Sequence, residues 1–234
     1  MLRTLWIRAI IESIPIAGNP SAWKEIESEL RAKGIVANDE RLLDYQEERD
    51  FIRMGGESYG ATFTVRVEGK SGATTRTVYA KAIIGGFGEE ATAMVVRAQV
   101  ERLRLLETWG IRTPHVYGCG KGTIYEEFIS GKVPEPAHYP DLEDLARIAA
   151  ILDCRGARPL NFLADLLEDG GGELRYVDAG CDLGHIEDGM VPRLERPALS
   201  TLLAAAGERA AEAVSAYERQ YQRVKAEPTQ GGGQ

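Results

Sequence analysis

The chain has 234 residues, which is enough for one or two domains that each bury a core. Hydrophobic residues make up 44% and charged residues 27%, as in ordinary globular proteins, and no apolar run approaches the roughly 18 residues of a membrane span. A net charge of −8 argues against nucleic acid as a partner, because non-specific binding to DNA or RNA needs a positive field. The three widely spaced cysteines predict a reducing, cytoplasmic setting.

The first part of the chain is predicted to be a helical extension over residues 1–50. Residues 2–14 are densely apolar and are expected to form a short buried helix or a strand. A helix that follows is expected to end near Lys33, with Gly34 just beyond it.

A change of period predicts a sheet after this extension. From Phe51 the sequence takes on strand character, and residues 63–67 alternate between apolar and polar side chains. A glycine-containing turn at residues 69–72 precedes a second apolar strand over residues 77–84. We therefore predict a three-stranded antiparallel meander.

A long helix over residues 89–109 follows the meander, and Gly110 ends it. Two more strands are predicted around residues 116–117 and 123–129. Residues 131–140 carry three prolines without a regular period, which indicates a hinge. The long helix is expected to bury one face, made of Ala91, Met94, Val95, Ala98, Leu105 and Leu106.

The second half is predicted to be mainly helical. A helix over residues 142–152 is followed by a glycine turn at 170–172, a short strand over 174–178 and one last helix over 197–224. A tail over residues 229–234 is expected to be disordered. The fold class is therefore α+β, with a β-rich first half and a helical second half.

Two features of the first half point to phosphate binding. Lys81 lies in an apolar strand, where burial would require an anion beside it; the alternative is a lysine on an edge strand that faces solvent. Residues 55–60 form a turn whose glycines would let backbone N–H groups approach a phosphate, with Gly55, Gly56, Ser58 and Gly60 as the candidate contacts.

Three further residues could complete such a site. Glu101 in the long helix flanks the predicted buried face, where it could meet a strand lysine, or else it is a solvated glutamate. Asn161 lies in a loop and Asp178 at a strand end, and together they offer the oxygen ligands that Mg²⁺ prefers. For Asp178 the alternative is an ordinary turn residue.

Taken in order, these segments resemble the protein-kinase-like fold, and specifically its aminoglycoside-phosphotransferase and small-molecule-kinase branch. The resemblance covers roughly residues 50–185. In the first half, residues 51–65 resemble the family's glycine-rich hairpin, and residues 78–81 resemble the strand that carries its phosphate-binding lysine. Residues 110–117 resemble the segment that follows the family's long N-lobe helix, called helix C, and residues 123–131 resemble the hinge strand, which offers backbone groups to adenine. In the second half, Asn161 matches the metal-binding asparagine of the catalytic loop, and residues 177–180 stand where the family has its Asp-Phe-Gly motif.

The resemblance implies a bilobal fold, with an antiparallel β-sheet N-lobe over residues 51–130 and a small, mainly helical C-lobe over residues 131–228. It also implies ATP and Mg²⁺ as cofactors. Lys81 would then bind the α- and β-phosphates, Asn161 and Asp178 would hold Mg²⁺, and the hinge at Glu127 and Phe128 would offer backbone groups to adenine.

One departure from the family concerns the catalytic base. The family has an aspartate five residues before the metal-binding asparagine, and this chain has Gly156 there. Asp153 is the nearest acid upstream and Asp165 the nearest downstream. The chain is therefore either a phosphotransferase that uses an acid such as Asp153, acting on a small molecule or a protein hydroxyl, or a pseudokinase that binds nucleotides or proteins. Whether Glu101 or Gln99 faces the lysine is also left open.

Other functional classes are weaker. Residues 56–60 fit the G-x-S-x-G motif of α/β-hydrolases, and Asp178 and His185 follow in the right order, but the alternating residues after Ser58 predict a hairpin instead of a nucleophile elbow. The three histidines are too far apart for a zinc site. Arg155 and Arg158 could hold an anionic substrate, or they could pair on the surface with Asp153 or Glu168.

Overall fold

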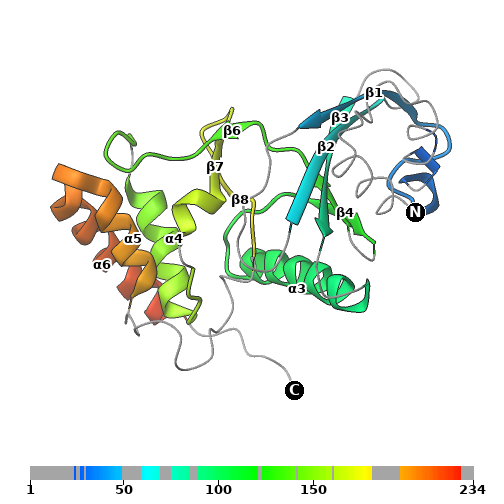
Figure 1. Ribbon diagram of the computed structural model, residues 1–234. Helices are drawn as coiled ribbons and strands as arrows, with labels where there is room; N and C mark the ends of the chain where they lie inside the picture. Colours follow the sequence, from blue (N-terminus) through cyan, green and yellow to red (C-terminus); the bar gives the residue numbers. More distant parts are fainter. Residues whose placement is uncertain are drawn as a thin grey trace. The chain divides into compact units, whose positions relative to one another are not determined.

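The structure is a computed structural model of the chain, and it confirms the α+β class (Figure 1). Two compact units can be distinguished: unit 1 comprises Met1–Glu101 and Pro114–Phe128, and unit 2 comprises Arg102–Thr113 and Ile129–Gln234. No helix in the described part of the chain is long and apolar enough to cross a membrane. The structure describes residues 24, 27, 28, 30–48, 59–68, 75–84, 89–120, 123–140, 142–159, 161–180 and 196–227.

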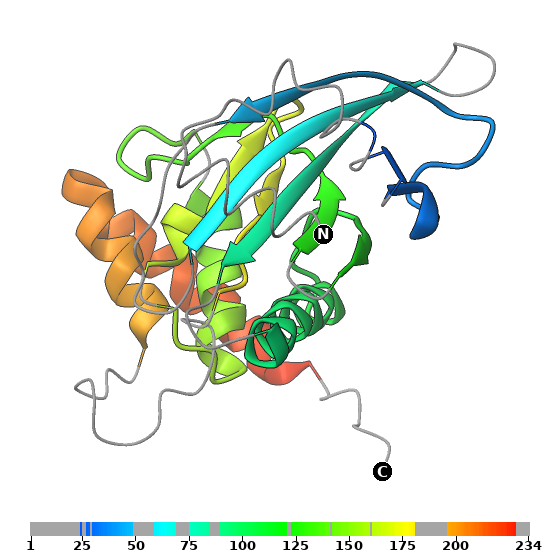
Figure 2. The same cartoon turned by 45° about the vertical axis from the view of Figure 1, so that its right-hand side comes forward.

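Unit 1 is built on a five-stranded antiparallel sheet with the strand order β1-β2-β3-β5-β4. The long strands β1, β2 and β3 are neighbours in this sheet (Figure 2). Strand β3 is its centre, since β2 and β5 pair with its two edges. The strands are β1 (Arg41–Glu48), β2 (Tyr59–Glu68), β3 (Thr75–Ile84), β4 (Val116–Cys119) and β5 (Thr123–Glu127).

The first strand comes earlier in the chain than the sequence predicts. Residues 41–48 form β1, although residues 1–50 are expected to be a helical extension. The register shifts between Leu42 and Asp44 along the pairing with β2. Such an irregularity breaks the two-residue alternation by which a strand is recognised, and β1 lies at the edge of the sheet, where both faces need not be apolar.

Helix α3 (Glu89–Thr108) occurs where it is predicted, but the face that it buries agrees with the predicted one only in part, at Leu106 and Val95. Met94 is 60% and Leu105 46% exposed. Val96 and Val100 instead pack against Ile124 of β5. Apolar residues occur on several sides of this helix, so contact with the sheet decides which of them is buried. The buried face consists of Val96, Gln99, Val100, Leu103 and Leu106.

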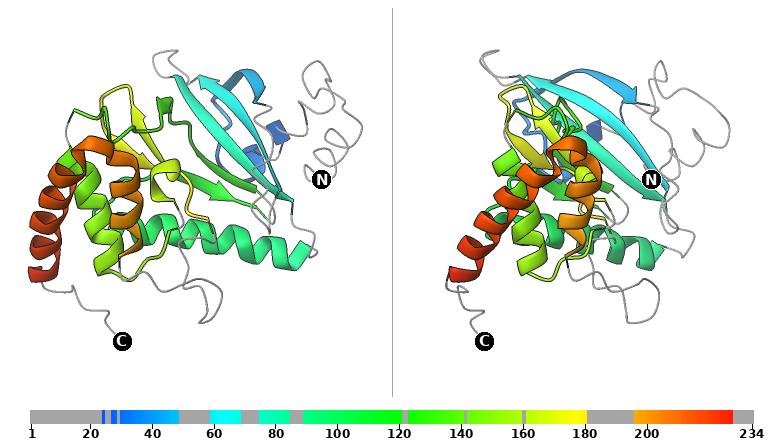
Figure 3. Two further views of the ribbon diagram at one scale, coloured as in Figure 1. Left: turned by 60° about the vertical axis from the view of Figure 1, so that its left-hand side comes forward. Right: turned by 90° about the vertical axis from the view of Figure 1, so that its left-hand side faces the viewer.

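Unit 2 combines three packed helices with a small sheet. Helix α4 (Leu142–Cys154) contacts both α5 (Pro197–Ala206) and α6 (Ala210–Ala226), as Figure 3 shows for the yellow-green, orange and red helices. The sheet has the antiparallel order β6-β7-β8, made of β6 (Gly131–Lys132), β7 (Leu166–Asp169) and β8 (Leu174–Tyr176). The largest fully buried side chains of this unit are Leu106, Ile111, Phe162, Tyr176 and Tyr217.

The last predicted helix is two helices in the structure. The apolar spacing from residue 197 to 224 predicts one continuous helix, but the chain breaks at Gly207, where φ is +56°. A 3₁₀ turn, η3 (Gly207–Arg209), then leads into α6. Glycine adopts this conformation without the steric cost that other residues meet, so the apolar stripe continues onto a second helix that packs against the first.

Candidate functional site

Lys81 lies in the central strand of the unit 1 sheet. It is opposite Thr62 of β2 and Ile124 of β5, so the alternative of an edge-strand lysine does not apply. Residues directly opposite each other in antiparallel strands point to the same face. Lys81 therefore shares a face with Ile124, the residue against which Val96 and Val100 of α3 pack. Its side chain is half-buried on the face of the sheet that α3 covers.

The structure distinguishes the two candidate residues on α3. Gln99 is only 6% exposed and belongs to the buried face of the helix. Glu101 is exposed. This position argues against the predicted role of Glu101 beside Lys81, and it leaves an amide in place of a carboxylate on the inner side of α3.

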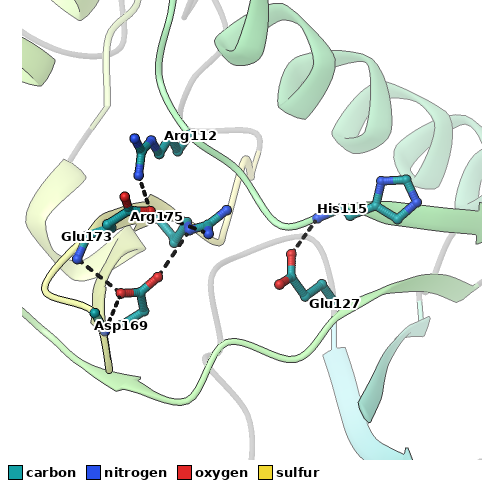
Figure 4. A network of polar contacts seen from close by, with 7 residues as sticks. Arg112, His115, Glu127, Asp169, Glu173 and Arg175 are labelled. Carbon is teal, nitrogen blue, oxygen red and sulfur yellow. Dashed lines mark hydrogen bonds and ion pairs between the residues drawn. The ribbon is translucent and has the colours of Figure 1, made fainter. Parts of the chain in front are cut away.

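The hinge strand ends with two amides that already donate within unit 1. The N–H of Glu127 donates to the carbonyl of His115 at 2.8 Å, and that of Phe128 to the carbonyl of Thr77 at 3.2 Å. The Glu127 carboxylate accepts from the His115 N–H at 3.2 Å (Figure 4). Adenine recognition by Glu127 and Phe128 stays a prediction, and it would use groups other than these two amides.

Of the predicted phosphate turn, residues 55–60, the structure describes only Tyr59 and Gly60. Gly55, Gly56 and Ser58 lie outside the described residues, as does His185 of the hydrolase alternative. Gly60 belongs to β2, opposite Ile83 of β3. The role of this turn over a triphosphate stays a prediction.

In unit 2, Asn161 and Asp178 lie on either side of the β7–β8 hairpin along the chain. Asn161 is exposed at the start of the 3₁₀ helix η1 (Phe162–Asp165), and its side chain does not cap that helix. Asp178 is half-buried two residues after β8. An amide oxygen and a carboxylate suit Mg²⁺, which is usually held by few protein groups together with phosphate and water. No three His, Cys, Asp or Glu side chains of the described ranges form a metal-binding group.

The backbone before Asp178 is held by two hydrogen bonds. The Tyr176 N–H donates to the carbonyl of Arg112, and the Val177 N–H donates to the carbonyl of Asp165, each at 2.8 Å. Asp165 itself is only 5% exposed, and its carboxylate accepts from the Tyr176 hydroxyl at 3.4 Å. Its burial argues against Asp165 as the catalytic base.

Gly156, which the resemblance would place at the position of the catalytic base, ends helix α4. Its φ of +75° is left-handed, its N–H donates to the carbonyl of Asp153 at 3.3 Å, and the Ala157 N–H donates to that of Leu152 at 2.9 Å. This pair of bonds is a Schellman motif, which favours glycine. The residue type therefore follows from the end of the helix.

The carboxylate of Asp153 binds the start of helix α5. Oδ1 accepts from the Ala198 N–H at 3.0 Å and Oδ2 from the Leu199 N–H at 3.1 Å, while the Tyr217 hydroxyl also donates to Oδ2 at 2.9 Å. Burial raises the pKa of Asp153, against the effect of these hydrogen bonds. The catalytic role of Asp153 stays a prediction, and these three contacts favour a structural one.

A polar network at the β7–β8 turn was not predicted from the sequence (Figure 4). Asp169 Oδ1 accepts from the N–H groups of Gly171 and Glu173 at 2.9 and 3.0 Å, and these bonds contribute to a lowered pKa of Asp169. Arg175 Nε lies 3.3 Å from Asp169 Oδ2, and the Arg112 guanidinium forms an ion pair with the Glu173 carboxylate. The signal available in the sequence was an aspartate directly before three glycines, which is typical of an Asx turn.

The predicted surface pairs of Arg155 and Arg158 are not formed. The Asp153 carboxylate binds the start of α5, and in the described part of the chain Glu168 pairs with Lys132, at 3.5 Å. Arg155 directly precedes Gly156, and Arg158 lies between Gly156 and Asn161. Both side chains are half-buried.

Comparisons with known proteins give little further information. No family model matches the chain, and no curated protein matches it. Among solved structures, the chain is similar to the Rio2 kinase-ADP/Mg²⁺-phosphoaspartate complex from Chaetomium thermophilum, with a TM-score of 0.44 and 12% sequence identity. The match covers 85% of this chain and 74% of that chain.

Proposed function

We propose that the chain is an ATP- and Mg²⁺-binding phosphotransferase of the protein-kinase-like superfamily, related to its aminoglycoside-phosphotransferase and small-molecule-kinase branch. The observation that carries the proposal is the position of Lys81 in the central strand, on the face that α3 covers. A lysine at this place in the sheet is the group that the resemblance assigns to a nucleotide phosphate. The acceptor would be a small-molecule or protein hydroxyl.

The chain order of the other residues supports this proposal. After the sheet and α3 come the hinge strand β5, then Asn161 before β7, and Asp178 after β8. The resemblance implies this order of lysine, helix, hinge, asparagine and aspartate. Lys81 would bind the α- and β-phosphates, and Asn161 and Asp178 would hold Mg²⁺. Bound Mg²⁺ would neutralise phosphate charge during transfer.

A second candidate function is a pseudokinase that binds the nucleotide without transferring phosphate. The observation in its favour is the lack of a suitable base among the predicted acids. Gly156 ends a helix, Asp153 is bound to α5, and Asp165 is buried. General-base catalysis needs a basic group, such as one of these carboxylates, within hydrogen-bond reach of the acceptor hydroxyl.

Thermal unfolding with ATP tests the nucleotide site. At about 100 times its Kd, a ligand stabilises the folded state by about 2.7 kcal/mol, which raises the Tm of a chain of this size by roughly 5–11 °C. We expect this shift with ATP and Mg²⁺, and a smaller one with EDTA. Lys81→Met and Asp178→Asn should lose it, whereas Lys132→Met, which changes a side chain that is 79% exposed, should keep it. The absence of a shift in the unmodified chain would overturn the proposal.

A turnover assay separates the two candidate functions. ADP release from ATP and Mg²⁺ is measured over hours for the unmodified chain, Asp153→Asn and Asp178→Asn. Turnover that Asp178→Asn abolishes supports the phosphotransferase. Nucleotide binding without turnover, in the presence of candidate hydroxyl acceptors, supports the pseudokinase.

A further inference from the structure

The segment that carries Asp178 is also held from the other side, by a side chain of helix α3. Arg102 Nη1 donates to the carbonyl oxygen of Gly180 at 2.8 Å, across 78 positions of sequence. Both residues belong to unit 2. A hydrogen bond from a guanidinium is charge-assisted and therefore stronger than a neutral one, and the arginine cannot lose its charge.

Arg102 differs from the other arginines of its helix. Arg97 and Arg104 are exposed, whereas Arg102 is half-buried. Its position follows from helix geometry, because it lies three residues after Gln99 and four residues before Leu106, which both belong to the buried face. The stem of Arg102 can therefore lie along the packed side of the helix while its guanidinium reaches the backbone.

The hydrogen bond from Arg102 to the Gly180 carbonyl, called the anchor below, holds a glycine, the residue type with the most backbone freedom. Ala179 is only 3% exposed and is fixed by packing, but Gly180 is a residue whose backbone has access to many conformations. Tyr176 and Val177 are already fixed by backbone hydrogen bonds. Arg102 supplies a contact on the other side of Asp178, so that the aspartate lies between two fixed points of the chain.

We propose that Arg102 is a positioning residue, which holds the Gly180 carbonyl so that the Asp178 carboxylate stays oriented for a metal–nucleotide ligand. The role in ligand binding rests on the proposed function, while the anchor itself does not. Without the anchor, only a fraction of the molecules would present Asp178 correctly, and the apparent Kd would rise by the inverse of that fraction. A loss of one charge-assisted hydrogen bond predicts an effect of roughly 10-fold.

The test compares Arg102→Met with Arg102→Lys and with the control Arg104→Met, all in the full chain. Methionine keeps an apolar stem of similar length and removes the donors, and lysine restores one charged donor. Arg104 is exposed on the same helix, so its replacement controls for the loss of a positive charge.

Two measurements are made on each variant. The first is hydrogen exchange of the peptide that spans residues 176–180, without nucleotide; we expect faster exchange in Arg102→Met, a smaller increase in Arg102→Lys and no change in Arg104→Met. The second is the Mg²⁺ concentration at half-maximal thermal stabilisation by ATP. We expect it to rise roughly 10-fold in Arg102→Met, to recover in part in Arg102→Lys and to stay unchanged in Arg104→Met.

The two measurements test the positioning role of Arg102 separately from nucleotide binding by the chain. Equal behaviour of Arg102→Met and Arg104→Met in both measurements would overturn the proposal. Faster exchange with an unchanged Mg²⁺ midpoint would overturn the positioning role and leave a purely structural contact. If the unmodified chain itself shows no stabilisation by ATP, the proposed function fails, and this role in metal–nucleotide binding fails with it.

Discussion

The contacts of Asp153 allow a prediction that separates a structural from a catalytic role. Its carboxylate accepts two N–H groups at the start of α5 and the hydroxyl of Tyr217. Loss of an N-terminal helix cap costs about 1 kcal/mol, and loss of a hydrogen bond to a charged group costs about 1.5–3 kcal/mol. Burial of the carboxylate, which raises the pKa of Asp153, offsets part of this gain. We therefore expect Asp153→Ala to lower the free energy of unfolding by about 3 kcal/mol, a loss of roughly 6–12 °C in Tm.

Thermal and urea unfolding of four proteins measures this cost: the unmodified chain, Asp153→Ala, Tyr217→Phe and the double variant. Because the two side chains share a hydrogen bond, the double variant should lose less stability than the sum of the single variants. Asp144→Ala, an exposed position on the same helix, is the control and should change the free energy of unfolding by less than about 0.5 kcal/mol.

Two results would refute this reasoning. One is an unchanged Tm in Asp153→Ala, which would mean that the contacts with α5 contribute nothing. The other is full additivity of Asp153→Ala and Tyr217→Phe. A variant Asp153→Asn that keeps its stability but loses turnover would instead support the catalytic prediction.

Three further predictions follow from single residues. Gly156→Ala should cost about 1–2 kcal/mol in the free energy of unfolding, because alanine is strained at a φ of +75°; an unchanged urea midpoint would contradict this. Hydrogen bonds from Arg219 and Gln220 lower the pKa of Glu143. The ionised Glu143 carboxylate therefore contributes to the free energy of unfolding above pH 4.5, and this contribution is lost as the pH falls through the lowered pKa. The difference in Tm between the unmodified chain and Glu143→Gln should become smaller over that pH range. Gln99→Ala should lower the free energy of unfolding by about 0.5–3 kcal/mol, because it removes a buried side chain, and Glu101→Ala by less than about 0.5 kcal/mol; equal losses in denaturant titrations would show that the buried face of α3 is misassigned.

Local signals in the sequence were sufficient for most elements that carry the candidate site. The spacing of apolar residues predicted α3 and α4 close to their observed bounds, alternation predicted β2, and an apolar run after a glycine turn predicted β3. These signals are strong because a helix or strand with one buried face repeats its apolar residues at a fixed period. Lys81 and Asp178 were singled out for a similar reason, as charged residues in or beside apolar strands.

Other features were decided only when distant segments met. Strand β1 has a register shift that hides its period, and the face of α3 was selected by contact with Ile124. The break at Gly207 also lies within an apolar stripe that suits one helix or two. In each case the local sequence is compatible with more than one arrangement, and packing against another element selects one of them.

The candidate catalytic acids show most clearly which features the sequence determined and which the tertiary structure decided. The sequence by itself determined that Gly156 stands where the resemblance would place an aspartate and that Asp153 is the nearest acid upstream. Only the tertiary structure decided where the Asp153 carboxylate points, because its hydrogen-bond partners in α5 and α6 lie 45 to 64 positions further along the chain. A hydrogen bond depends on distance and direction in space, and the spacing of residues along a chain does not specify either of them across such a separation.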